Sequence, residues 1–263
     1  MRRTVSASLC LIGMLISASA LAQGFAAMVS PPRFELKTKP GKTLRSIIEV
    51  SNRSSAPATF LIHTADWTLA PDFSVTFHDD LKADSCRPWV ALERPEAVVP
   101  GGGTVRYRFE VTVPADAPAG ECRFAVMIEG DRPSIARSNG LNVPVTGRIG
   151  VIVYLTVGDG EPDLEILGPE ITTLNGRQVP TLRIHNGGTA HGRMGGYLTG
   201  TDAKGISYDF TPSDFPILPQ EVREVFLTPS TATSDHPTLT FPVTVKGTLE
   251  WGEHKTALDQ RFE

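Results

Sequence analysis

The chain has 263 residues, with 25 basic and 29 acidic side chains and a formal net charge of −4. This acidic balance argues against nucleic acid or an anionic membrane surface as the partner. The length is sufficient for two domains of ordinary size.

The first 22 residues have the pattern of a cleaved signal peptide. Arg2 and Arg3 form a short positive region, an apolar run follows over 9–20, and 20–22 reads A-L-A, the small residues that a signal peptidase recognises. The apolar run is shorter than the roughly 20 residues that a permanent membrane helix needs. We therefore expect an exported mature chain that begins near Gln23 and has no membrane anchor. It keeps 23 basic and 29 acidic residues, a net charge of −6.

Export also decides how the cysteines are interpreted. Cys10 is lost with the signal peptide, which leaves Cys86 and Cys122. Two cysteines in an oxidising compartment most simply form one disulfide, which should stabilise its domain by roughly 3–4 kcal/mol. The competing metal or redox interpretation is weak, because the chain has no C-x-x-C pair and no histidine close to either cysteine in sequence.

The mature chain shows short strands separated by Gly, Pro, Asn or Asp, and almost no helical periodicity. This spacing is typical of an all-β sandwich. The clearest strand covers 105–113, where Val, Tyr, Phe, Val and Val alternate with polar residues. In this half of the chain we expect strands at 43–50, 59–63, 89–92, 105–113 and 122–128, with a polar stretch through 67–77.

The segment 141–157 differs from the other strands in its length. Leu141, Val143 and Val145 share one parity with the apolar residues of 149–157, in a segment much longer than the usual 5–6 residues. Pro144 cannot donate to a ladder, so the first part should lie at a sheet edge or beside a bulge. A long apolar edge invites pairing with another chain's strand. The alternative is a long last strand covered entirely by its own sandwich.

The polar sequence D-G-E-P at 159–162 marks a domain boundary. We expect a signal peptide at 1–22, an N-terminal immunoglobulin-like domain at 23–158 and a C-terminal immunoglobulin-like domain at 159–263. The fold class is therefore all-β, with two immunoglobulin-like sandwiches in tandem. Strand candidates in the second domain are 164–167, 180–185, 196–201, 221–227, 241–245 and 247–251.

No arrangement of residues points to catalysis. The six histidines are scattered singly, and none forms an H-x-H or H-E-x-x-H pair. The glycines at 101–103 lack the Lys and Ser/Thr that follow in a phosphate loop. We expect no catalytic residue, no metal and no cofactor, and therefore a binding protein and not an enzyme.

Arg33 is a candidate binding residue. It follows Pro31 and Pro32, which hold the backbone extended and aim the side chain predictably. A guanidinium is suited to bidentate pairing with a carboxylate. The alternative is an ordinary surface arginine on an edge strand.

Three stretches together resemble the PapD-like periplasmic pilus chaperones. They are V-S-P-P-R-F-E-L at 29–36, S-I-I-E-V-S-N-R-S-S-A-P at 46–57, and V-V-P-G-G-G-T-V-R-Y-R-F-E-V at 98–111. The resemblance implies two immunoglobulin-like domains whose first domain lends its last strand to an incomplete pilin-like subunit. It implies no use of nucleotide, a periplasmic location, pilin-like subunits as partners, and an outer-membrane usher as a further candidate partner.

The resemblance also assigns roles to individual residues. Arg33 matches the arginine that anchors the subunit's terminal carboxylate, and Leu141, Val143 and Val145 match the donated apolar residues. The chain departs from the pattern where the family has a second cation, a lysine, because Gly150 stands there. Arg148, two residues earlier on the same strand face, is the candidate substitute.

Two other functions stay open at this stage. The first is a structural or adhesive immunoglobulin-like component of a cell-envelope or pilus complex, which would stay with its client in the fibre. The second is a sandwich that binds carbohydrate or metal.

Overall fold

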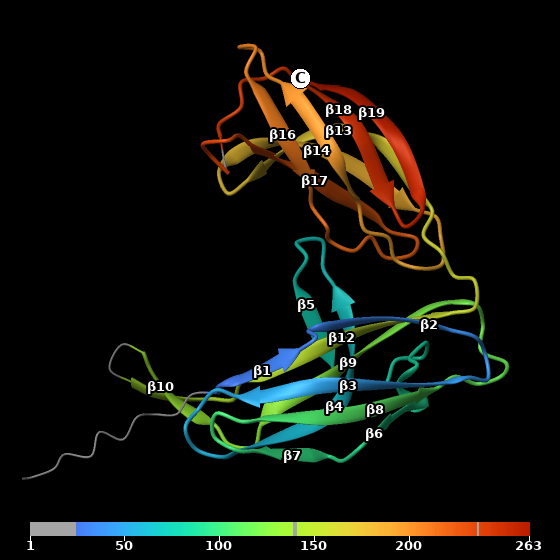
Figure 1. Cartoon of the computed structure of the whole chain (residues 1–263), viewed down its shortest axis with the longest axis vertical. Coiled ribbons are helices and arrows are strands. Elements are labelled where there is room, and N and C mark those ends of the chain that lie inside the picture. The colour runs from blue at the N-terminus through green and yellow to red at the C-terminus, as the bar shows by residue number, and fades with distance from the viewer. Residues whose placement is uncertain (1–24, 139–140, 236) are drawn as a thin grey trace, which may run out of the picture.

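The structure is a computed structural model that describes residues 25–138, 141–235 and 237–263. The predicted signal peptide at 1–22 lies outside the described residues. The described chain consists of strands and loops with one short 3-10 turn at Arg87–Trp89, and none of it forms a helix capable of crossing a membrane. The predicted fold class is confirmed, since the strands form two β-sandwiches in tandem (Figure 1).

The first sandwich has two facing sheets. One has the order β1-β3-β8-β6, and the other has the order β2-β12-β9-β4-β5, with β7 also paired to β4. A separate ribbon of β10 and β11 extends from the β9 and β12 ends (Figure 1). The strands are β1 Ala27–Ser30, β2 Arg33–Thr38, β3 Thr43–Asn52, β4 Ala58–Leu69, β5 Val75–His78, β6 Val90–Leu92, β7 Glu96–Val99, β8 Thr104–Thr112, β9 Gly120–Gly130, β10 Ser134–Ser138, β11 Leu141–Val145 and β12 Arg148–Val157.

The alternation read from the sequence decides which side chains form this core. Tyr107, Phe109 and Val111 of β8 are buried, while the polar residues between them face outward. The disulfide expected between Cys86 and Cys122 is present, with the two Cα atoms 6.1 Å apart. It ties the loop before the 3-10 turn to β9, and Cys86 lies inside the core.

The predicted strand over 141–157 is divided in two. β12 pairs with β9, and after a break at Thr146 and Gly147 the segment β11 pairs with β10 instead. A Cβ at position 147 would lie 2.2 Å from the Phe25 ring, so the absence of a side chain there lets Phe25 close the end of the core. Pro144 lies in β11, away from the main sheet, as its missing N–H predicts.

The stretch through 67–77, which was expected to be polar and had no strand assigned to it, forms a β-hairpin. β4 continues to Leu69, turns, and returns as β5, with Trp67 opposite Phe77. The polar residues that obscured the pattern lie largely at its turn and on its outer face. Trp67 is buried and its indole N–H donates to the Phe124 carbonyl at 3.2 Å.

The second sandwich is built from β13 to β19. β17 pairs with β14 through its first half and with β16 through its second half, so this strand joins the two layers. β16 and β19 were not expected from the sequence, and the candidates 241–245 and 247–251 form one strand through Gly247. The strands are β13 Leu164–Leu174, β14 Arg177–Asn186, β15 Gly195–Thr201, β16 Ser207–Pro212, β17 Val222–Ser230, β18 Val243–Trp251 and β19 His254–Phe262.

The first sandwich ends its last strand at Val157 and the second begins at Leu164, so the boundary expected at residue 159 falls in the loop between them. Away from this loop, the tip of the β4–β5 hairpin contacts the second sandwich (Figure 1). Arg223 donates to the carbonyls of Leu69 and Ala70, and Phe73 stacks on Phe215 with ring centroids 4.0 Å apart. The two sandwiches therefore contact each other away from the loop that connects them.

Asp202 organises a turn in the second sandwich. Its carboxylate accepts hydrogen bonds from the backbone N–H groups of Lys204 and Ile206 and from the hydroxyl of Tyr208. Burial by itself would raise the pKa of Asp202. The hydrogen bonds from Ile206, Lys204, Tyr208 and Thr240 outweigh that effect and hold the pKa below its usual 3.8.

The lowered pKa of Asp202 predicts how the stability of the protein should change with pH. The stabilisation from Asp202 is present above the pKa of the unfolded chain and is lost as the pH falls through the lower pKa of the folded chain. Asp202→Asn should cost about 1–3 kcal/mol of unfolding free energy at neutral pH. The difference from the unaltered protein should shrink below pH 3.8. Denaturant unfolding over this pH range measures it. Asp209→Asn, at an exposed position on β16, is the control and should change little.

Candidate functional site

The N-terminal half of β12 lies at a sheet edge. β9 pairs with all of β12, but β2 pairs only with Ile152–Val157, starting at Arg33. Within the described chain, Arg148–Val151 therefore has a strand on one side only, and so does the adjoining strand β11, which pairs with β10. An edge of this kind presents backbone groups to which another strand can be added.

The apolar side chains along this edge change from buried to exposed. Val151 and Val153 are fully buried, whereas Val143 and Val145 are 40% and 44% exposed. Val143 and Val145 belong to β11, which pairs with β10 in a two-stranded sheet separate from the one that contains β12. The backbone of Leu141 belongs to β11, and its side chain is outside the described atoms.

Arg33 lies where β2 begins. It is opposite Ile152 in the parallel pair, and its Nε lies 3.0 Å from Oε1 of Glu35. A strand added to the free edge of β12 would meet the start of β2, so one end of that strand would come next to Arg33. This position follows from the register alone.

Arg148 and Arg33 share the outer face of the sheet but not one place on it. Arg148 lies opposite Glu129, with its guanidinium 3.8 Å from that carboxylate and 5.9 Å from the centroid of Phe77. Four residues separate it from Ile152, the partner of Arg33, which is about 13 Å along a strand. The role of Arg148 as the second cation stays a prediction.

Gly150, which replaces the family's lysine, is covered by an aromatic ring. A Cβ there would lie 2.3 Å from Cζ of Phe77, a residue of β5. Phe77 belongs to an apolar cluster on the outer face of this sheet that includes Trp67, Met127 and Leu218 of the second sandwich. The hairpin therefore fills the space that a side chain at position 150 would need.

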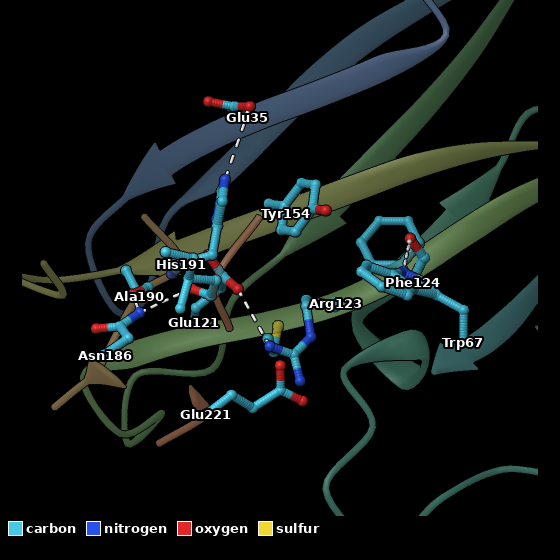
Figure 2. A network of polar contacts seen from close by, with 12 residues as sticks. Glu35, Trp67, Glu121, Arg123, Phe124, Tyr154, Asn186, Ala190, His191 and Glu221 are labelled. Carbon is cyan, nitrogen blue, oxygen red and sulfur yellow. Dashed lines mark hydrogen bonds and ion pairs between the residues drawn. The ribbon is translucent and has the colours of Figure 1, made fainter. Parts of the chain in front are cut away.

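A polar cluster joins the outer face of the sheet to the second sandwich (Figure 2). Glu121 of β9 has a fully buried side chain and accepts hydrogen bonds from the backbone N–H of His191, at 3.0 Å, and from its ring Nδ1. The His191 ring stacks on Tyr154 with centroids 3.9 Å apart. On its other side, Nε2 of His191 lies 3.7 Å from Glu35.

Arg193 completes the cluster. Its Nε lies 3.5 Å from Oε1 of Glu35, and its guanidinium lies 5.7 Å from the centroid of Tyr154. Burial raises the pKa of the Tyr154 hydroxyl, although the Arg193 charge opposes the change, so Tyr154 is a neutral hydroxyl at physiological pH. In the described parts of the chain, no three His, Cys, Asp or Glu residues form a metal site.

Sequence reasoning identified Arg33 and the apolar edge but missed four residues around them. Glu35 was detectable, because it is two residues from Arg33 and therefore on the same face of a strand. Phe77 lay at the end of a stretch that was described only as polar. Tyr154 was noted only as part of an apolar run, and His191 lies 70 residues from its partner Glu121, with no local signal.

No protein-family model matches the chain, and neither does any curated protein. Among solved structures, the chain is similar to several fimbrial chaperones. The class 5 fimbriae chaperone CfaA has a TM-score of 0.47 and 15% identity, covering 90% of this chain and 99% of that chain. The E. coli chaperone DraB has a TM-score of 0.46 and 14% identity, covering 92% and 99%.

A third similar structure is of the Salmonella enterica SafA pilin in complex with the SafB chaperone, with a TM-score of 0.45 and 12% identity, covering 91% of this chain and 99% of that chain. Because the identities and TM-scores are low, the function proposed below is derived from the residues of this chain.

The packing of Phe77 over Gly150 can be tested with a double-mutant cycle. Gly150→Ala should cost about 1–2 kcal/mol of unfolding free energy, because the ring has to shift to admit the new Cβ. In a Phe77→Ala background the same change should cost almost nothing. Gly195→Ala is the control, since a Cβ there meets only one atom, at 3.8 Å. An equal cost of Gly150→Ala in both backgrounds would contradict this packing.

Proposed function

We propose that this protein is a periplasmic chaperone that holds pilin-like subunits by pairing the free edge of β11 and β12 with a strand of the subunit. The observation that carries the proposal is the edge at Arg148–Val151, which has no second strand among the described residues. The exposed Val143 and Val145 beside it offer apolar groups to an incomplete core.

The position of β2 fixes where the added strand ends, and the charge of Arg33 favours one of its two directions. Since β2 occupies the same edge from Ile152 onward, the added strand has to end there. A strand running parallel to β12 would bring its C-terminal end to Arg33, whose guanidinium is suited to a terminal carboxylate. Shape and charge at this end of the edge therefore support the carboxylate role of Arg33.

The periplasmic location is part of the proposal. It is supported by the signal-peptide pattern at 1–22 and by the disulfide between Cys86 and Cys122, which requires an oxidising compartment to persist. Binding by strand addition needs no nucleotide and no bond cleavage. The proposed protein therefore acts without catalysis.

The proposal predicts separate effects of one double variant on binding and on folding. Val143→Thr combined with Val145→Thr should leave thermal stability nearly unchanged, because both side chains are already about half exposed. It should weaken binding of a co-expressed pilin-like subunit about ten- to a hundredfold, since apolar groups that fill the subunit's core are lost. Soluble subunit recovered with the chaperone, and the dissociation constant of the purified complex, measure the effect.

The matched control is Val98→Thr combined with Val222→Thr, at positions 61% and 46% exposed and away from the edge. It should leave subunit binding unchanged. If Val143→Thr and Val145→Thr instead unfold the first sandwich, these residues belong to its own core and the strand-pairing function is wrong. Finding this protein as a permanent part of the assembled fibre would favour the structural alternative.

A further inference from the structure

Arg33 is already neutralised in the free chain. Glu35 lies on the same face of β2, and Oε1 of its carboxylate is 3.0 Å from Nε of Arg33. The two side chains are 43% and 48% exposed. Within the described ranges, this contact is an ion pair, and the side chain of Arg33 makes no hydrogen bond. Its charge is therefore balanced, while its donors remain available for a better acceptor.

Glu35 also lies within reach of a second arginine. Its Oε1 atom is 3.5 Å from Nε of Arg193 and 3.7 Å from Nε2 of His191, both from the second sandwich (Figure 2 shows the latter contact). The Nε of Arg193 is buried and has no hydrogen-bond partner among the described residues. A buried donor without an acceptor is unfavourable, so Arg193 would gain from a closer carboxylate.

We propose that Glu35 is an internal competitor for Arg33, which an incoming carboxylate has to displace. In the free chain the Glu35 carboxylate is shared between Arg33, at 3.0 Å, and Arg193, at 3.5 Å, and on binding it pairs with Arg193 alone while the incoming carboxylate takes the guanidinium of Arg33. This inference rests on the proposed function, because the ligand it names is the terminal carboxylate of the bound subunit.

The exchange requires little energy on either side. Exposed ion pairs contribute little to stability, so the Arg33 to Glu35 contact is easily given up. The released Glu35 is not left without a cation, because Arg193 is adjacent. A carboxylate that pairs with Arg33 through two aligned hydrogen bonds makes a stronger contact than the one it replaces.

The same arrangement discriminates between anions. A subunit strand paired along Arg148–Val151 would hold its terminal carboxylate beside Arg33 at a high effective concentration. A free anion in solution has no such advantage and has to compete with Glu35 unaided. Glu35 therefore favours a carboxylate delivered on a paired strand and disfavours small anions of the periplasm.

Acetate alone tests the competition without any subunit. The NMR signal of the Arg33 Nε–H group should follow acetate binding, and Glu35→Gln should lower the acetate dissociation constant roughly two- to fivefold, the range expected for an exposed ion pair. The matched control is Glu110→Gln, which removes an equal charge from another exposed pair, with Arg45 at 2.6 Å. It should leave acetate binding at Arg33 unchanged.

A second variant should change the acetate affinity of Arg33 in the opposite direction. Arg193→Gln removes the alternative partner of Glu35, so acetate should bind Arg33 more weakly than in the unaltered chain. This variant also decides the question if Glu35→Gln fails to fold. Acetate binding that is unchanged or weaker in Glu35→Gln, or unchanged in Arg193→Gln, would overturn the proposal.

Subunit binding separates this proposal from the function on which it rests. Glu35→Gln should strengthen binding of a pilin-like subunit with its native C-terminus, and should not affect a subunit whose C-terminus is extended by Gly-Ser. If Val143→Thr and Val145→Thr leave subunit binding intact, the strand-pairing function is wrong. The acetate experiment then still tests whether Glu35 competes for Arg33. If those variants weaken binding but Glu35→Gln does not strengthen it, only the competitor role is wrong.

Discussion

The switch of the chain from one sheet to the other at Pro31 and Pro32 is the constraint on which the candidate site depends. β1 pairs with β3 in one sheet, and after the two prolines β2 pairs with β12 in the other. Proline has no N–H to give to a ladder, so β2 cannot continue backward along β12 beyond Arg33. The edge of β12 is therefore covered by β2 from Ile152 to Val157 and is open over Arg148–Val151. The same switch puts a cation at the boundary between the covered and open parts.

The second sandwich limits the site from the outer face of the sheet. The β4–β5 hairpin bends over that face and rests on Arg223 and Phe215, while Phe77 occupies the space above Gly150. Further along the sheet, buried Glu121 is held by His191. A buried carboxylate needs such partners, because the cost of removing it from water has to be offset. Arg33, Glu35 and Arg193 lie close together where the two sandwiches meet.

Local patterns predicted the parts of the fold that depend on alternation. In β8 and β12 every second residue is apolar, and most of those residues are buried in the core, because opposite faces of a strand meet opposite environments. The same reasoning failed for the β4–β5 hairpin, whose polar residues at 70–76 resemble a loop. The sequence predicts two strands at 241–245 and 247–251, but they form one strand, β18, in which the missing Cβ of Gly247 allows the close approach of the Tyr197 carbonyl of β15. Both errors arose where contacts distant in sequence, and not the local pattern, decided the backbone.

The sequence by itself determined the all-β class, the parity of the core, the partner cysteines and the extended, proline-led approach to Arg33. Each follows from residue type and spacing within a few positions, or from a simple count. Only the tertiary structure decided that β2 pairs with β12 from Ile152 onward and no earlier. It also decided that Phe77 fills the place above Gly150, and that Glu35 lies between Arg33 and Arg193. These facts join residues up to about 160 positions apart along the chain. Such pairings depend on how the sheets pack and how the two sandwiches meet, and no local periodicity records them.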